Sequence, residues 1–264
     1  MCVISTVFGA KNTHRVFGNF FLLKMQNRGD FHLTRAVFFG YNAHIIQEQT
    51  KSQRTTARGG KTVTPQNIVV KERAMKILEE RILRDGKVQT GNVLKVGGFL
   101  NHLIDYQLLD EIGKEISALF CGQKITKILT IEASGIAIAC AAAHYVCAPV
   151  LFAKKSKTIN ISSDCYCAEV YSFTHQVSKM IMVEKDFLTK DDKVLIVDDF
   201  LANGAAINGL MSLVEQAGAE LVGCAVAIEK GFQGGGDELR AKGINVQSLA
   251  LIDSMDDGKI TFRN

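Results

Sequence analysis

The stretch VLIVDDFLANGAA, residues 194–206, is the segment that most constrains the fold of this chain. Its four apolar residues at 194–197 predict a buried strand, two adjacent acids end it, and a short loop of small residues leads into a helix. Ligands of open parallel sheets bind at the carboxyl ends of the strands. Such a loop brings backbone N–H groups to a helix N-terminus, a favourable place for a phosphate, and Gly204 lets the backbone approach an anion.

The acidic pair Asp198 and Asp199 is unexpected beside a phosphate, because two carboxylates would repel that anion. The pair fits the site if it faces sugar hydroxyls or a metal ion. A solvated acidic pair at an ordinary strand end is the alternative, but the apolar run before the pair and the small-residue loop after it favour a ligand site.

Strands and helices alternate on both sides of this segment. Asp105 predicts a helix cap, and the helix runs to about Phe120 with apolar residues on one face. Further strands are predicted at 128–131, 150–152, near 180–183, at 193–197 and at 221–228, with helices from Gly135 and at 204–217. This alternation predicts an α/β fold whose mostly parallel sheet is covered by helices.

The chain divides into two parts of different character. Residues 1–74 hold 11 Lys and Arg against 3 Asp and Glu, and they show no sustained periodicity. From Met75 onward, local signals agree with one another. We therefore expect a domain at 75–264, preceded by an atypical basic extension that is either disordered or the product of a start codon assigned too far upstream.

Composition excludes several classes of protein. No apolar run reaches the roughly 18 residues of a membrane span, and the first residues lack the basic region of a signal peptide. The seven cysteines include no paired C-x-x-C, so we expect reduced thiols in a cytoplasmic protein rather than zinc ligands or disulfides.

The stretch 194–206 resembles the fingerprint of type I phosphoribosyltransferases. From Met75 to the last residue, the chain resembles the bacterial xanthine phosphoribosyltransferases. The motifs that carry this second resemblance are Arg84-Asp85-Gly86, VLKV at 93–96, FLNH at 99–102, IEASGI at 131–136, VYSFT at 170–174 and IEK at 228–230.

The resemblance implies the type I phosphoribosyltransferase fold with a small hood region. It implies an enzyme of purine salvage that converts xanthine and 5-phosphoribosyl 1-pyrophosphate (PRPP) to xanthosine 5′-monophosphate and pyrophosphate. Mg²⁺ would accompany PRPP, held mainly through substrate oxygens, so no residue is expected to be a dedicated metal ligand. The implied assembly is a homodimer, with neither membrane nor nucleic acid as a partner.

The same resemblance implies the site residues in four groups. The catalytic acids are Asp198 and Asp199. The PRPP phosphate loop is Ala202, Asn203, Gly204, Ala205 and Ala206, the pyrophosphate loop is Glu132, Ala133, Ser134 and Gly135, and the purine contacts are Leu94, Asn101 and Lys230. Three positions depart from the family pattern: Gly97-Gly98 replace Asp-Ser, Lys154 replaces Arg, and Ala205 replaces Gln.

Some of these segments also have simpler interpretations. Residues 132–135 could be an ordinary helix start with Ser134 as its cap. The lysines at 154, 155 and 157 could be a solvated loop or an active-site lid. Gly234–Gly236 are interpreted as a flexible start of the last helix.

Two alternative functions stay open. One is a phosphoribosyltransferase for another purine, such as adenine, guanine or hypoxanthine. Lys230 offers donors only, which favours a 6-oxo purine over adenine. The other is a purine-responsive transcription repressor, which the basic extension suggests, although residues 1–74 lack two clean amphipathic helices joined by a short turn.

Overall fold

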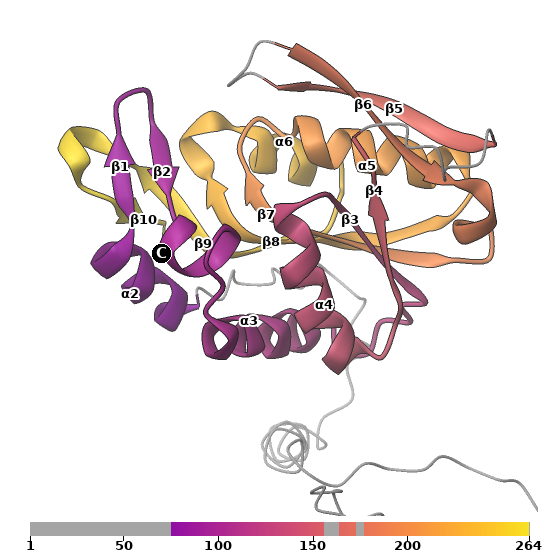
Figure 1. Ribbon diagram of the computed structural model, residues 1–264, viewed down its shortest axis with the longest axis horizontal. Coiled ribbons are helices and arrows are strands. Elements are labelled where there is room, and N and C mark those ends of the chain that lie inside the picture. Colours follow the sequence, from indigo (N-terminus) through magenta and orange to yellow (C-terminus); the bar gives the residue numbers. More distant parts are fainter. Residues whose placement is uncertain (1–74, 156–163, 173–176, 264) are drawn as a thin grey trace, which may run out of the picture. The chain divides into compact units, whose positions relative to one another are not determined.

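The computed structural model describes residues 75–155, 164–172 and 177–263 (Figure 1). The predicted extension at 1–74 lies outside the described residues, and so does Lys157.

A six-stranded sheet forms the centre of the domain, with strand order β10-β9-β8-β7-β3-β4. The strands are β3 (Lys127–Ile131), β4 (Val150–Ala153), β7 (Lys193–Leu201), β8 (Glu220–Lys230), β9 (Val246–Ser254) and β10 (Thr261–Phe262). All neighbours are parallel except β10, which pairs antiparallel with β9. The predicted mostly parallel sheet is confirmed.

Helices cover both faces of this sheet (Figure 1). The longer ones are α2 (Lys76–Asp85), α3 (Tyr106–Leu119), α4 (Ser134–Val146), α5 (Ala205–Gln216) and α6 (Gly235–Ala241). Successive β7 side chains point to opposite faces, so Leu195 and Val197 pack with α2, α3 and α4, while Val194 and Ile196 pack with α5. A strand covered on both faces needs the continuous apolar run that the sequence shows.

The start of α3 follows its sequence signal. The Asp105 side chain accepts hydrogen bonds from the backbone N–H groups of Gln107 and Leu108, at 3.1 and 3.3 Å, which confirms the predicted cap. Leu108, Ile112 and Ile116 are buried along one face, as their spacing predicts.

Two hairpins and four short helices complete the domain. The hairpin of β1 (Lys87–Gln89) and β2 (Val93–Lys95) leads into a π-helix, η1 (Gly97–Asn101). The hairpin of β5 (Cys165–Ser172) and β6 (Val177–Glu184) lies over α5 (Figure 1). The remaining short helices are η2 (Lys185–Phe187), η3 (Gly231–Gln233) and η4 (Asp256–Gly258).

Within the described ranges, no helix combines the length and apolar character that a transmembrane span requires. Among the described residues, Cys121, Cys140, Cys147, Cys167 and Cys224 are free thiols, and burial of Cys224 in the sheet raises its thiol pKa to about 12.

Candidate active site

The acidic pair lies within β7 rather than at its end. Asp198 is paired in register with Val226, and Phe200 and Leu201 continue the ladder with β8. The prediction that the two acids end the strand is therefore wrong. The reason is tertiary, because β8 extends to Lys230 and supplies hydrogen-bonding partners beyond the acids.

The electrostatics of the pair follow from its burial. Asp198 is 3% exposed and Asp199 is 8% exposed. Loss of hydration raises the pKa of Asp198 well above its usual value, and the neighbouring charge of Asp199 raises it further. The backbone N–H of Asp199, which donates to Asp198 Oδ1 at 3.0 Å, and the charge of Lys155 act in the opposite direction. The ionised form of Asp198 is therefore disfavoured by its surroundings.

The loop at 132–135 contacts this pair. Gly135 is buried, and a methyl group there would lie 2.8 Å from Asp198 Oδ1 and would overlap the Thr130 hydroxyl. Only glycine fits between the two side chains. The Thr130 hydroxyl is buried and has no hydrogen-bond partner within the described residues.

The interpretation of Ser134 as a helix cap is wrong. Ser134 is the first residue of α4, and the capping position belongs to Ala133, whose backbone is close to helical and which has no side chain to accept a hydrogen bond. The Glu132–Ala133 peptide bond is cis. With Ala133 at the capping position, the first backbone N–H groups of α4 have no side-chain acceptor.

The basic segment after β4 is tied to this loop. The Glu132 carboxylate accepts a hydrogen bond from the backbone N–H of Lys155 at 2.6 Å. Lys154 exchanges two backbone hydrogen bonds with Met182, each of 3.0 Å. A freely solvated loop is therefore an incomplete description of Lys154 and Lys155, whose backbones are held by neighbouring elements.

The small-residue loop joins β7 to α5 as predicted. Gly204 is buried at the helix N-cap with φ +82°, a conformation that glycine adopts without steric cost. The Ala205 N–H donates to Asn203 Oδ1 at 3.1 Å, and the side-chain amide of Asn208 donates to the Gly204 carbonyl at 2.9 Å. These two bonds hold the end of the loop that leads into α5, which begins at Ala205.

Two of the predicted purine contacts share a hollow of about 410 Å³ beside the β1–β2 hairpin. Leu94 is buried in β2, whereas Asn101 is exposed at the end of η1. Gly97 and Gly98 line the same hollow, and a side chain at Gly98 would meet no atom within 4 Å. The presence of Gly97-Gly98 in place of the Asp-Ser of the family pattern therefore leaves the hollow open.

A hydrogen bond connects this hollow to the acidic pair. Asn101 Nδ2 donates to Asp199 Oδ2 at 3.0 Å, between residues 98 positions apart in the sequence. The π-helix makes this contact available, because it buries Phe99 and Leu100 and leaves Asn101 at its end. Single π-turns of this kind are frequent at functional sites.

Lys230 lies at the end of β8 and does not line the hollow. Its ammonium donates to the Asn92 carbonyl at 2.9 Å and lies 5.7 Å from the centre of the Phe200 ring. Partial burial lowers the pKa of Lys230. Lys230 thus contacts the turn of the β1–β2 hairpin, the same hairpin that carries Leu94.

The structure therefore gathers most of the predicted residues around the carboxyl end of β7. It also adds Thr130, Asn92 and Phe200, to which sequence reasoning assigned no role in the site. Thr130 had a detectable signal, a polar residue inside an apolar strand. Asn92 contributes a backbone carbonyl, for which no sequence signal exists.

This arrangement suits a phosphorylated sugar that carries a flat heterocycle. A glycine-containing helix start can bind a phosphate, and the buried carboxylates can accept hydrogen bonds from sugar hydroxyls. The hollow beside Leu94 and Asn101 offers one apolar wall and one amide to a ring with polar edges.

Comparison with known proteins identifies the family. The phosphoribosyl transferase domain matches residues 98–246. A xanthine phosphoribosyltransferase of Lachnoclostridium phytofermentans is 53% identical over 191 residues, which cover 72% of this chain and 98% of that protein. One of Bifidobacterium longum is 55% identical over 193 residues, which cover 72% of this chain and all of that protein.

Solved structures agree on the fold. The adenine phosphoribosyltransferase of Rhodothermus marinus superimposes with a TM-score of 0.54 at 25% identity, covering 67% of this chain and 98% of that one. That of Trypanosoma brucei gives 0.55 at 19% identity, covering 66% and 78%. The chain belongs to the phosphoribosyltransferase family, among its xanthine phosphoribosyltransferases.

Proposed function

We propose that this enzyme transfers the phosphoribosyl group of PRPP to xanthine in purine salvage. A purine ring nitrogen forms a bond to the anomeric carbon while the bond from that carbon to pyrophosphate breaks, and the N–H proton of the purine is released. The observation that carries the proposal is the hydrogen bond between Asn101 and Asp199, because it joins the base hollow to the buried carboxylates.

The proposed roles follow from position and charge. The ribose passes through a cationic, oxocarbenium-like state, which the negative potential of Asp198 and Asp199 would stabilise. The loop at 202–206 would hold the 5′-phosphate at the start of α5. The loop at 132–135, adjacent to Asp198 through Gly135, would hold the pyrophosphate.

Base selection would depend on Lys230, Asn101 and the apolar wall at Leu94. An ammonium group and a carbonyl oxygen form a charge-assisted hydrogen bond. Adenine places an amino donor where a 6-oxo purine has an acceptor, and each unsatisfied polar group in a closed site costs about 1–3 kcal/mol. We therefore expect xanthine to be preferred to guanine and hypoxanthine, and adenine to be almost excluded.

Mg²⁺ with PRPP fits the residues that are present. The described residues contain no group of three or more His, Cys, Asp or Glu side chains placed to hold a metal, but Asp198 and Asp199 stand side by side at the site. Mg²⁺ is commonly bound by one or two carboxylates together with substrate phosphates. These two acids could complete its shell, and the ion would neutralise charge on the departing pyrophosphate.

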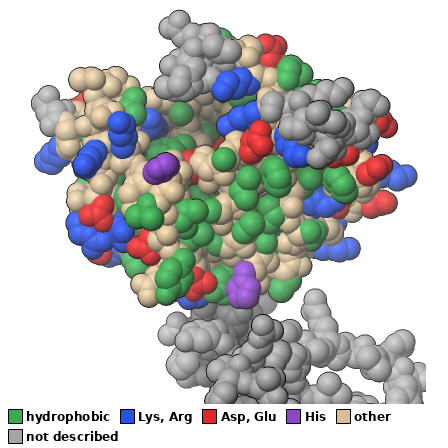
Figure 2. Space-filling view, viewed as in Figure 1, with side chains coloured by type: hydrophobic (Ala, Val, Ile, Leu, Met, Phe, Trp, Pro, Cys, Tyr) green, Lys and Arg blue, Asp and Glu red, His purple; other side chains and the backbone are tan. Residues whose placement is uncertain are grey.

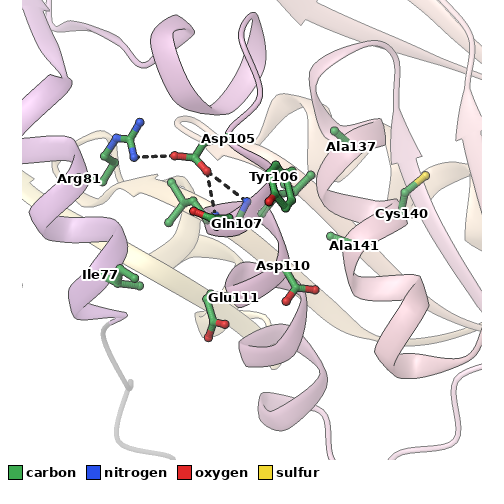
Figure 3. A pocket seen from close by; sticks show the side chains of 12 residues that line it. Ile77, Arg81, Asp105, Tyr106, Gln107, Asp110, Glu111, Ala137, Cys140 and Ala141 are labelled. Carbon is green, nitrogen blue, oxygen red and sulfur yellow. Dashed lines mark hydrogen bonds and ion pairs between the residues drawn. The ribbon is translucent and has the colours of Figure 1, made fainter. Parts of the chain in front are cut away.

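We also infer a homodimer, supported by an apolar face. A groove of about 900 Å³ lies between α2, α3 and α4 (Figure 3), lined partly by Ile77, Tyr106, Ala137 and Cys140. Figure 2 shows hydrophobic side chains gathered in the middle of this side of the molecule. The α4 sequence is apolar around most of its circumference, yet Cys140 is exposed, and helices of such composition are ordinarily covered.

Sedimentation velocity tests the assembly, and a monomer at micromolar concentration would contradict it.

We further propose that the protein is cytoplasmic, that residues 75–264 form the catalytic domain, and that residues 1–74 are dispensable for catalysis.

The decisive experiment is a panel of xanthine, guanine, hypoxanthine and adenine with PRPP and Mg²⁺. Lys230→Met is measured in parallel, with the exposed Lys242→Met as its matched control. We expect the KM for xanthine to rise in Lys230→Met far more than the KM for PRPP, and to stay constant in the control. Efficient adenine turnover, or an unchanged xanthine KM in Lys230→Met, would contradict the assignment.

A further inference from the structure

The start of α6 is packed directly against the phosphate loop. The Gly235 N–H donates to the Ala202 carbonyl at 3.1 Å. A methyl group at Gly235 would overlap that carbonyl oxygen and would lie 2.5 Å from both Asn203 C and Gly204 N. All three are backbone atoms, so no side-chain rotation could relieve the overlap.

The next residue, Gly236, is enclosed by a different set of atoms. A side chain at Gly236 would overlap the carboxylate of Glu229, which is fully buried. Two hydrogen bonds from the Arg240 guanidinium, at 3.0 and 2.7 Å, and one from the Ser248 hydroxyl hold that carboxylate in place. Glu229 directly precedes Lys230 in β8.

These contacts correct the interpretation of Gly234–Gly236 as a flexible helix start. Gly235 and Gly236 are both buried, and each lacks a side chain because another group occupies that space. Gly234 differs from the other two, since it has φ +79° and open space within 4 Å of the position that a methyl group would take.

We propose that Gly235 is a positioning residue for the phosphate loop, and that Gly235 and Gly236 together set the spacing between that loop and Lys230. This inference rests on the proposed function, since it assigns Gly235 to the placement of the PRPP 5′-phosphate. The contacts form one continuous path, from residues 202–204 through Gly235 and Gly236 to Glu229 and Lys230.

The size of the effect follows from the geometry. Ordinary contact begins at 3.4 Å, so a methyl group at 2.5 Å requires the loop and α6 to separate by about 1 Å. A displacement of about 1 Å in a positioning element can lower the rate by roughly 100-fold. We therefore expect a large effect on PRPP and a small one on xanthine.

The test compares Gly235→Ala with Gly113→Ala in the full chain. A methyl group at Gly113 would lie 2.5 Å from the backbone oxygen of Ala141, so it creates a similar overlap between α3 and α4, away from the phosphate loop. The measurements are kcat, the KM values for PRPP and xanthine, the melting temperature, and the affinity for ribose 5-phosphate by calorimetry.

We expect both variants to melt at a lower temperature than the wild type. Gly235→Ala should raise the KM for PRPP at least tenfold and weaken ribose 5-phosphate binding to a similar degree, while the KM for xanthine changes severalfold less. Gly113→Ala should leave the affinity for ribose 5-phosphate near that of the wild type, because α4 carries the proposed pyrophosphate loop and not the loop at 202–206.

A second variant covers the case in which Gly235→Ala does not fold. Leu239, which is 1% exposed, anchors α6 in the core, so Leu239→Ala loosens α6 without placing an atom near the loop. It should raise the KM for PRPP severalfold and weaken ribose 5-phosphate binding.

Two failures are distinguishable. If the wild type turns over xanthine but a folded Gly235→Ala, or Leu239→Ala in its place, binds ribose 5-phosphate as tightly as Gly113→Ala does, the role of Gly235 is overturned. If the wild type turns over no purine with PRPP, the proposed function itself is wrong, and ribose 5-phosphate affinity still decides the role of Gly235.

Discussion

Replacement of the acidic pair by asparagine is the sharpest probe of the site. Asparagine has nearly the shape of aspartate and keeps one acceptor oxygen, so Asp198→Asn, Asp199→Asn and the double variant should all fold. These variants remove negative charge from the place where the proposed chemistry needs it. The loss should therefore fall on kcat rather than on the folded structure.

The burial of the two carboxylates sets the expected size of the loss in kcat. Both carboxylates are almost fully buried, at 3% and 8% exposure, so an effective dielectric constant of about 20 is appropriate. One unit charge about 4 Å from a cationic centre then contributes ~4 kcal/mol. Because each ~1.4 kcal/mol is a factor of ten in rate, a full charge corresponds to ~1,000-fold in kcat.

The two acids should not contribute independently. Burial and the neighbouring charge of Asp199 both raise the pKa of Asp198, so the ionised form of Asp198 is disfavoured. We expect a loss of ~1,000-fold in the double variant, less in Asp198→Asn than in Asp199→Asn, and no multiplication of the two single effects.

The assay is kcat at saturating xanthine and PRPP, with circular dichroism and thermal melting as folding controls. The exposed Asp191, which lies just before β7, supplies the matched control Asp191→Asn, and its kcat should not change. A folded double variant with kcat within about tenfold of the wild type would refute the electrostatic role.

Three other outcomes are expected. Because its pKa is raised on folding, Asp198 stabilises the folded state in its protonated form. This contribution to stability is complete below about pH 3.8, the pKa in the unfolded chain, and is lost as the pH rises through the pKa of the folded state. Asp198→Asn should therefore have a higher melting temperature than the wild type at about pH 8, and the difference should shrink towards about pH 4. A chain starting at Met75, whose N–H donates to the Leu249 carbonyl at 2.7 Å, should be soluble and fully active, and aggregation or loss of purine turnover would contradict this. Arg240→Met leaves the buried Glu229 carboxylate without its cation and should lower the free energy of unfolding by about 3–5 kcal/mol in urea titrations, against less than ~1 kcal/mol for a change at the exposed ion pair of Arg84.

The predictable part of the fold lay in segments whose neighbours in sequence are also their neighbours in space. The cap at Asp105 and the apolar face of α3 depend on residues within a few positions of one another. The buried strand at 194–197 was predictable for another reason, because a strand covered on both faces requires the continuous apolar run that this segment shows. The β1–β2 hairpin was missed, because three-residue strands carry too few alternations to be recognised.

The sequence by itself determined the α/β class, the position of the acidic pair beside a small-residue loop that opens a helix and, through its motifs, the family. Only the tertiary structure decided that Asp198 and Asp199 lie inside a strand, that Asn101 bonds to Asp199, and that Gly235 is packed against the loop. The physical reason is that burial, pKa and close backbone packing depend on elements brought together from distant parts of the chain. No local pattern in the sequence records how far β8 extends or which atoms enclose a glycine.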